Sequence, residues 1–175
     1  RSLISVTAVG KVKKGKMVST GGAKPGMDLV LTKWIALEGT SIIAKDYEKE
    51  LLEKLPQSLV DTAKSFDKYL SVLPESRIAV EHGVAAMHDV TEGGIFGALW
   101  EMGEASGVGL DVDLKAIPVK QETIEVCEYF GINPYELISS GAMLIATEDG
   151  NGLVRKLNDA GVASAIIGKS NSSNL

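Results

Sequence analysis

Residues 83–114, GVAAMHDVTEGGIFGALWEMGEASGVGLDVDL, predict a strand, a helix and a second strand in succession. The run 84–87 is short and apolar, and residues 94–106 carry apolar side chains at the spacing of an amphipathic helix. Residues 108–114 then alternate apolar side chains with Gly and Asp, which is typical of a strand with one face in water. This succession favours a sheet with helices packed on it.

The same kind of pattern extends toward both ends of the chain. Branched apolar runs predict further strands, and i, i+3/i+4 spacing predicts further helices. The expected strands are 3–12, 29–35, 84–87, 108–114, 142–147 and 162–167. The expected helices are 47–55, 59–70, 74–81, 94–106, 121–130 and 152–160. Together they predict an α+β or α/β layer fold, with some antiparallel pairing because strand 108–114 alternates.

The composition is that of an ordinary globular protein. Hydrophobic residues make up 45% and charged residues 23% of the 175 residues, which excludes a disordered or collagen-like chain. The net charge of −5 argues against nucleic acid as the main partner. The sequence has no apolar stretch long enough to cross a membrane, and we expect no signal peptide. Cys127, the only cysteine, excludes an internal disulfide and fits a reducing cytoplasm.

The charge is unevenly distributed along the chain. Residues 1–40 carry a net charge of +5, residues 41–82 of −2 and residues 83–175 of −8. Such a change of sign indicates two modules or two faces. The first residue is Arg rather than Met, so we expect a piece of a longer chain.

The strongest candidate for chemistry is the segment His88-Asp89-Val90-Thr91-Glu92-Gly93-Gly94, between the predicted strand and helix. Glycines at such a junction let backbone amides approach a ligand, and a helix start carries partial positive charge. Gly93 and Gly94 are therefore candidates for binding a phosphate or carboxylate, with His88 beside them. Asp89 and Thr91 are the candidates for positioning substrate or metal.

The acids of this segment limit what it can bind. Asp89 and Glu92 would repel a bare anion, so a bound phosphate needs Mg²⁺ or a lysine; otherwise the acids suit an amine or amide. The alternative is that Asp89 and Thr91 only cap the helix and the glycines only make the turn. His88 is then a hydrogen-bonded structural residue. His82 is the only other histidine in the sequence, and two histidines do not make a histidine metal cluster.

Two further segments follow the same logic. Glu38-Gly39-Thr40-Ser41 comes after strand 29–35 and is predicted to be a loop whose carboxylate and hydroxyls contact substrate. The alternative is an ordinary turn in which Thr40 or Ser41 caps the next helix. Ser139-Ser140-Gly141 precedes strand 142–147, but no base is evident that would make either serine a nucleophile. The lysines of 11–16 suggest a solvated hairpin tip, and Cys127 suggests helix packing.

Several runs together closely resemble the C-terminal domain of the AIR synthase-related superfamily. These runs are MHDVTEGGIFGALWEMGEASGVGLDVD, EVCEYFGINP, ISSGAMLIATE and GVASAIIGK. The superfamily includes aminoimidazole ribonucleotide synthase, selenophosphate synthetase, thiamine monophosphate kinase and HypE-type hydrogenase maturation proteins. The HypE-type branch is the most similar, since it shares an Asp-x-Thr-x-Gly-Gly loop, here Asp89, Thr91, Gly93 and Gly94. VTAVGKV and KPGMDLVL resemble the end of the family's N-terminal domain and the crossing into the second.

The resemblance implies a domain organisation. Residues 1–35 are expected to be the end of an N-terminal ATP-binding domain and the crossing strand, 36–170 the C-terminal domain, and 171–175 a polar tail. The implied fold is α+β, with a roughly four-stranded mixed sheet packed with helices. ATP and Mg²⁺ are expected mostly on the missing N-terminal domain, so we expect this piece alone to be inactive and to bind ATP weakly or not at all.

The resemblance also implies a function. The loop with Asp89 and Thr91 is expected to line the cleft where a small-molecule substrate is activated by phosphorylation. The intact protein is expected to be a cytoplasmic homodimer that works with other maturation proteins.

Two departures leave the substrate open. HypE-type proteins carry Asn-Glu-Gly where this chain has Ser139-Ser140-Gly141, so their glutamate is Ser140 here. The tail 171–175 also lacks their terminal cysteine. Carbamoyl dehydration is therefore in doubt, and two alternatives stand beside a maturation factor. One is a non-catalytic ligand-binding or assembly module, and the other is an enzyme acting on a purine- or thiamine-pathway phosphate compound.

Overall fold

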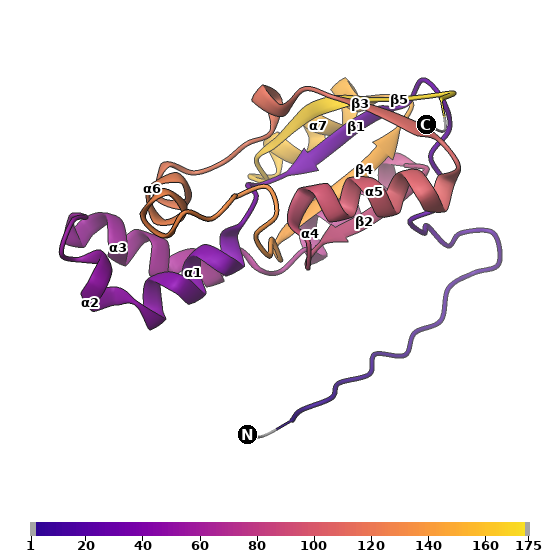
Figure 1. Ribbon diagram of the computed structural model, residues 1–175. Helices are drawn as coiled ribbons and strands as arrows, with labels where there is room; N and C mark the ends of the chain where they lie inside the picture. The colour runs from indigo at the N-terminus through magenta and orange to yellow at the C-terminus, as the bar shows by residue number, and fades with distance from the viewer. Residues whose placement is uncertain (1–2, 174–175) are drawn as a thin grey trace.

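The computed structural model describes residues 3–173 and contains one five-stranded sheet (Figure 1). The strand order is β2-β4-β1-β5-β3. The strands are β1 (Asp28–Thr32), β2 (Ala86–Val90), β3 (Gly109–Val112), β4 (Ala142–Thr147) and β5 (Ser164–Asn171). The α+β prediction is confirmed.

The sheet differs in detail from the expected four-stranded mixed sheet. It has a fifth strand because β3 pairs with the outer edge of β5, from Gly109 opposite Asn171 to Val112 opposite Gly168. Its strand pairs are all antiparallel. Within residues 3–173 the parallel pairing is an isolated bridge between Ser19 and Ala86.

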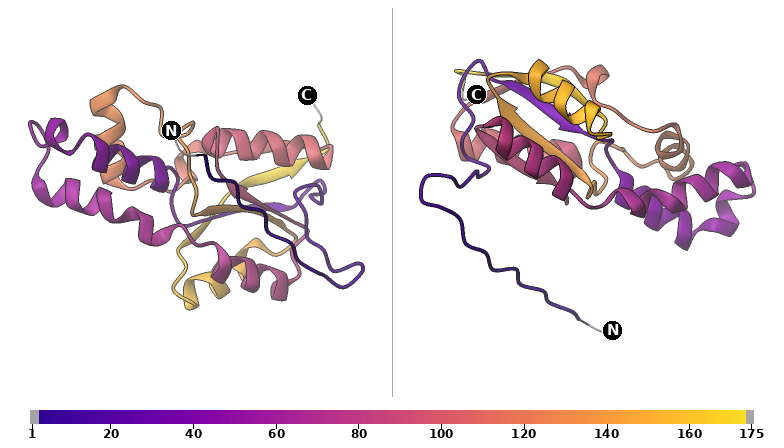
Figure 2. Two further views of the ribbon diagram at one scale, coloured as in Figure 1. Left: turned by 90° about the horizontal axis from the view of Figure 1, so that it is seen from below. Right: turned by 180° about the vertical axis from the view of Figure 1, so that it is seen from behind.

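Helices cover both faces of the sheet, and four of them form a separate lobe at one end. The helices are α1 (Leu37–Asp46), α2 (Glu48–Leu51), α3 (Gln57–Lys64), α4 (Leu73–His82), α5 (Gly94–Ser106), α6 (Gln121–Phe130) and α7 (Gly150–Asp159). Short 3₁₀ helices span Ser65–Tyr69 and Leu114–Ala116. α5 packs on one face and α4 and α7 on the other, while α1, α2, α3 and α6 extend from one end of the sheet (Figures 1 and 2).

The two-sided cover explains the apolar run 142–147. Every residue of β4 is buried, because the strand has helices above and below it. Leu144 and Ala146 pack on the α5 side, and Met143 and Ile145 pack on the side of α4 and α7. A strand buried on both faces is expected to have a continuous apolar sequence rather than an alternating one.

The described chain has no helix long and apolar enough to span a membrane.

The prediction of a strand at 3–12 is wrong. These residues run as extended chain away from the body (Figure 1), with Leu3 97% and Val9 92% exposed. A strand needs a neighbour to pair its amides and carbonyls. The neighbouring sheet edge, β2, instead bonds residue 19, through Met87 N to Ser19 O at 3.2 Å. The lysine-rich stretch 11–16 contains a turn but no hairpin, because neither flank is a strand.

The bounds of several elements differ from those predicted, and β2 is the one that affects the candidate site. β2 continues to Val90, so His88 and Asp89 belong to the strand and not to the loop after it. β1 lies between β4 and β5 at the centre of the sheet, on the N-terminal side of the domain division expected after residue 35. Because β1 pairs on both sides, it is structurally part of the same unit as residues 36–170.

Candidate functional site

The loop between α6 and β4 brings three sequence motifs together. Ser139 N donates to Thr91 O at 3.3 Å, which ties the loop to the β2–α5 junction. Gly39 N donates to Ile138 O at 3.1 Å, and Ala36 N donates to Ser139 Oγ at 2.7 Å, which ties it to the start of α1. Segments far apart in the sequence therefore meet at residues 138–141, at the end of the sheet where β4 begins.

The β2–α5 junction is a glycine turn pressed against this loop. Gly93 and Gly94 adopt φ angles of 77° and 60°, which L side chains rarely adopt. A Cβ on Gly94 would overlap Tyr135 O and lie 2.8 Å from the Glu136 carbonyl carbon. Gly94 N donates to Thr91 O at 3.1 Å, so this amide already has a partner.

The capping alternative is wrong for this junction. Gly93 is the N-cap of α5, and no side chain caps the helix. Asp89 lies in β2 opposite Met143, and Thr91 uses its backbone carbonyl, not its hydroxyl, to accept from Gly94 and Ser139. Asp89 is exposed and Thr91 is half-buried, so both can meet a ligand from solvent.

His88 does not join Asp89 and Thr91. Neighbouring side chains on a strand point to opposite faces, so His88 and Asp89 diverge. His88 lies on the α5 side, where its two ring nitrogens contact Thr20 and Glu101. The structure therefore places His88 on the opposite face of β2 from Asp89, although the sequence analysis grouped the two residues in one site.

The segment 38–41 forms the first turns of α1, so its prediction as a loop is wrong. Ala36 precedes the helix with a φ of 58°, and the helix begins at Leu37 without a side-chain cap. Thr40 is fully buried and donates to Thr123 Oγ1 at 3.0 Å, which turns its hydroxyl into the lobe. Gly39 is buried against the Leu137 side chain. The Glu38 carboxylate is not fully paired: its Oε2 atom is buried and has no hydrogen-bond partner among the described residues.

A buried ion pair lies under this end of the sheet, and neither of its partners was predicted from the sequence. Lys33 Nζ lies 2.7 Å from Glu75 Oε1 and donates to the carbonyls of Tyr69 and Ser71 at 2.7 and 2.8 Å. Gly141 packs against the same backbone segment, residues 69–71, where a Cβ on Gly141 would lie 2.7 Å from Tyr69 O. Lys33 therefore fixes the backbone on which residues 139–141 rest. Its position directly after a buried strand was the available signal.

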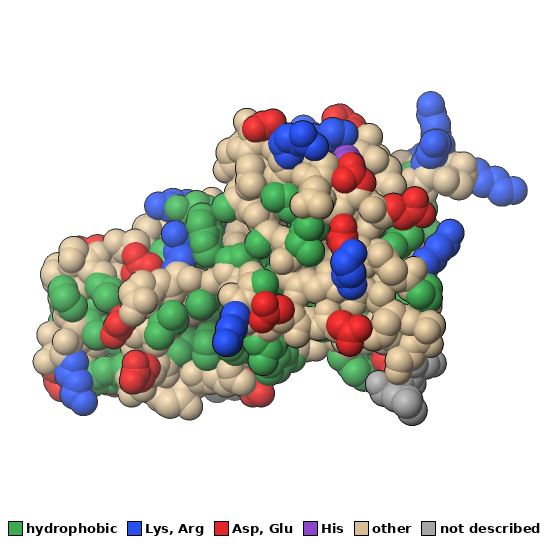
Figure 3. Space-filling model, turned by 90° about the horizontal axis from the view of Figure 1, so that it is seen from above, with side chains coloured by type: hydrophobic (Ala, Val, Ile, Leu, Met, Phe, Trp, Pro, Cys, Tyr) green, Lys and Arg blue, Asp and Glu red, His purple; other side chains and the backbone are tan. Residues whose placement is uncertain are grey.

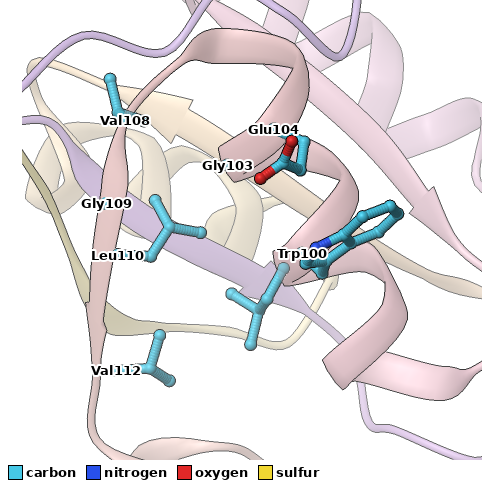
Figure 4. Close-up of a pocket in the computed structure, with 8 residues that line it drawn as sticks. Trp100, Gly103, Glu104, Val108, Gly109, Leu110 and Val112 are labelled. Atoms are coloured by element: carbon cyan, nitrogen blue, oxygen red, sulfur yellow. The ribbon is translucent and has the colours of Figure 1, made fainter. Parts of the chain in front are cut away.

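An apolar groove lies elsewhere, between α5 and β3. It has a volume of about 380 Å³ and is lined mainly by apolar side chains, among them Leu99, Leu110 and Val112. Leu110 and Val112 point from β3 toward the helix, and Trp100, which is 67% exposed, lies at its rim (Figure 4). None of the predicted site residues lines this groove.

The remaining candidate groups are structural. Cys127 is buried in α6, and burial raises the pKa of its thiol to about 11, as expected for a packing residue. Residues 3–173 contain no group of three or more His, Cys, Asp or Glu side chains placed to hold a metal ion. On the face seen in Figure 3, basic and acidic side chains are mixed.

Comparison with known proteins gives a family and a set of relatives. The family model described as "AIR synthase related protein, C-terminal domain" matches residues 24–174. The carbamoyl dehydratase HypE of Cupriavidus necator is 32% identical over 141 residues, which is 81% of this chain and 38% of that protein. The chain thus spans well under half the length of this relative.

Solved structures of HypE share the fold. E. coli HypE superposes with a TM-score of 0.73 at 22% identity, over 89% of this chain and 47% of that chain. A HypE–HypF complex gives a TM-score of 0.69 at 22% identity, over 90% and 50% of the two chains. HypE in complex with ATP gives 0.64 at 18% identity, over 89% and 45%.

Proposed function

Because this chain belongs to the AIR synthase-related family through its C-terminal domain, we propose that it is the C-terminal part of an ATP-dependent enzyme that activates a small molecule by phosphorylation. The observation that carries the proposal is the meeting of the α1 start, the β2–α5 junction and residues 138–141 at one end of the sheet. Separate segments that converge on one surface are the usual construction of a substrate cleft. The ATP-bound HypE relative supports the nucleotide as the co-substrate.

We assign a different role to each described side chain near this end of the sheet. Asp89 is exposed and Thr91 is half-buried at the end of β2, and both are proposed to position the substrate or a nucleotide-bound metal. Glu38 adds a second carboxylate from α1 with an unpartnered oxygen. Gly94 and the buried Thr40 are proposed to shape the cleft rather than to touch the ligand, since their polar groups are already paired.

The residues present fit ATP only with a counter-cation. Asp89, Glu92 and Glu38 are all acidic, so a bare triphosphate would be repelled. Carboxylates are good ligands for Mg²⁺, which would neutralise the phosphates. Asp89 is the residue proposed to contact that metal, while most of the nucleotide site is expected on an N-terminal domain. If the chain divides in this way, the central place of β1 favours a boundary before residue 28.

We predict that Asp89→Ala in the longer protein that carries this chain lowers ATP hydrolysis by roughly 10²-fold, because a metal or substrate contact is lost. Thr91→Ala is expected to lower it less, since a neutral hydroxyl is removed. Asp111→Ala, an exposed acid on β3, is the matched control. Unchanged turnover in both Asp89 and Thr91 variants would remove this segment from the mechanism.

The 175-residue chain alone is predicted to bind Mg-ATP weakly or not at all by titration calorimetry, because most of the nucleotide site is expected on the N-terminal domain and the acids Asp89 and Glu92 would repel the phosphates. The longer protein under the same conditions is the control and is expected to bind. Micromolar affinity of the short chain would place the nucleotide site on this domain and contradict the proposed division of labour.

A second class of function rests on Ser140. This half-buried serine offers no carboxylate at the centre of the convergent segment. A module that binds a ligand or a maturation partner without turnover would need no carboxylate at this position. A partner of the HypF kind is proposed here, on the model of the HypE–HypF complex. Tight binding of such a partner with no ATP turnover by the longer protein would favour this alternative.

A further inference from the structure

A second polar cluster lies on the opposite face of β2 from Asp89. His88 Nδ1 lies 3.0 Å from Thr20 Oγ1, and His88 Nε2 lies 2.5 Å from Glu101 Oε2. A carboxylate only accepts hydrogen bonds, so in the neutral imidazole Nε2 carries the proton. Nδ1 then accepts from the Thr20 hydroxyl. The order is hydroxyl, base and acid, each within hydrogen-bond reach of the next.

The chain around Thr20 is held from both sides. Ser106 Oγ donates to Thr20 O at 3.3 Å, and Ala23 N donates to Ser106 Oγ at 3.2 Å. A Cβ on Gly21 would overlap Ala105 O, and one on Gly22 would overlap Ala85 O. The segment is therefore pressed between α5 and β2, and the hydroxyl is presented to His88 in a fixed geometry.

The cluster is also open to solvent on one side. The His88 side chain is 18% exposed and that of Glu101 is 50% exposed, while Thr20 is half-buried. Here a reagent can approach the hydroxyl while its partners stay in place.

We propose that Thr20 is an activated nucleophile that accepts an acyl group from a neutral ester. A hydroxyl bonded to a base that is itself oriented by a third group is the signature of such a nucleophile. An acyl donor is favoured over a phosphoryl donor, because a phosphate would bring negative charge beside Glu101. The inference is independent of the ATP-dependent function proposed above.

The step balances without a cofactor. Thr20 Oγ forms a bond to the ester carbonyl carbon, and its proton passes to His88 Nδ1. Glu101 stabilises the imidazolium through Nε2. The bond from the carbonyl carbon to the leaving oxygen then breaks, and His88 returns the proton to that oxygen. The products are an alcohol or phenol and an acyl ester on Thr20, which water can hydrolyse.

The test uses p-nitrophenyl acetate and the full chain. Release of nitrophenol and acetylation of Thr20, located by peptide mass spectrometry, are expected. His88→Asn is expected to slow the acetylation of Thr20 by about 10²-fold, the usual contribution of a general base. Thr20→Val is expected to abolish it and Thr20→Ser to preserve it, whereas Ser19→Ala, a neighbouring exposed hydroxyl, leaves it unchanged.

Each readout decides the proposal. Acetyl groups found on lysines but not on Thr20 would overturn it, as would equal rates of Thr20 acetylation in wild type and His88→Asn. If His88→Asn fails to fold by circular dichroism, Glu101→Gln takes its place, because Glu101 is half exposed on α5. Normal acetylation of Thr20 in that variant would equally refute the relay.

Discussion

Replacing Lys33 with methionine is expected to lower the free energy of unfolding by about 3–5 kcal/mol, the usual cost of removing one partner from a buried ion pair. Glu75 is 1% exposed and lies 2.7 Å from the Lys33 ammonium, so it would be left as a buried acid without a counter-charge. The carbonyls of Tyr69 and Ser71 would lose their donor as well. Urea unfolding followed by circular dichroism measures the loss.

Two further variants separate this effect from a general loss of charge. Lys45→Met removes an ion pair of similar length, 2.6 Å, on the surface. The hydrogen bond from Lys45 lowers the pKa of the Asp67 carboxyl, yet both side chains are in water, so only a small change in stability is expected.

Adding Glu75→Leu to Lys33→Met should recover part of the stability, because no unpaired charge is then buried. Thr32 would lose its acceptor in that double variant, which limits the recovery. Equal losses for Lys33→Met and Lys45→Met would show that burial of the pair does not matter.

Elements set by local pattern could be predicted from the sequence. The helix at 94–106 has its predicted bounds, and the continuous apolar run 142–147 is a strand of that extent. Both owe their pattern to a fixed environment, one face on the core for the helix and two faces for the strand. The fold class follows from such elements, since they admit few packed arrangements.

Segments whose conformation depends on contacts with distant parts of the chain could not be predicted. Residues 3–12 have the composition of a strand but no neighbour among the described residues. The start of α1 depends on left-handed backbone at Lys33 and Ala36, residues that rarely adopt it. Tertiary contacts hold both positions: the Lys33 side chain is anchored by Glu75, and Ala36 N by Ser139 Oγ. The local sequence identifies neither Glu75 nor Ser139 as the partner.

The sequence singled out the motifs of the candidate site but did not predict how they are arranged. The structure brings 88–94 and 139–141 next to the start of α1, an arrangement that the sequence did not predict, through contacts such as the one between Ala36 and Ser139, 103 positions apart. Within each motif, however, the side chains face different directions. A strand alternates its faces, so a motif read as one site divides into an Asp89 side and a His88 side.

Replacing Gly94 with alanine is expected to lower the free energy of unfolding by about 2–5 kcal/mol, from left-handed strain and overpacking together. The new Cβ would meet backbone rather than a movable side chain, with Tyr135 O overlapped and Leu137 O at 2.9 Å. The loop 135–141 must then shift, and with it the contact between Ser139 and Thr91. Loss of ATP turnover by the longer protein is therefore expected together with faster amide exchange in this loop.

Gly93→Ala is the matched control because it separates strain from collision. Gly93 has a φ of 77°, so alanine is strained there by a similar amount, about 1–2 kcal/mol. Its Cβ would lie 3.4 Å from Gly97 Cα, an ordinary contact, so the loop 135–141 should stay in place. If both variants lose the same stability and leave amide exchange in 135–141 unchanged, close packing at Gly94 does not hold the three segments together. A larger loss at Gly94, with exchange increased only in that loop, is the result that the geometry predicts.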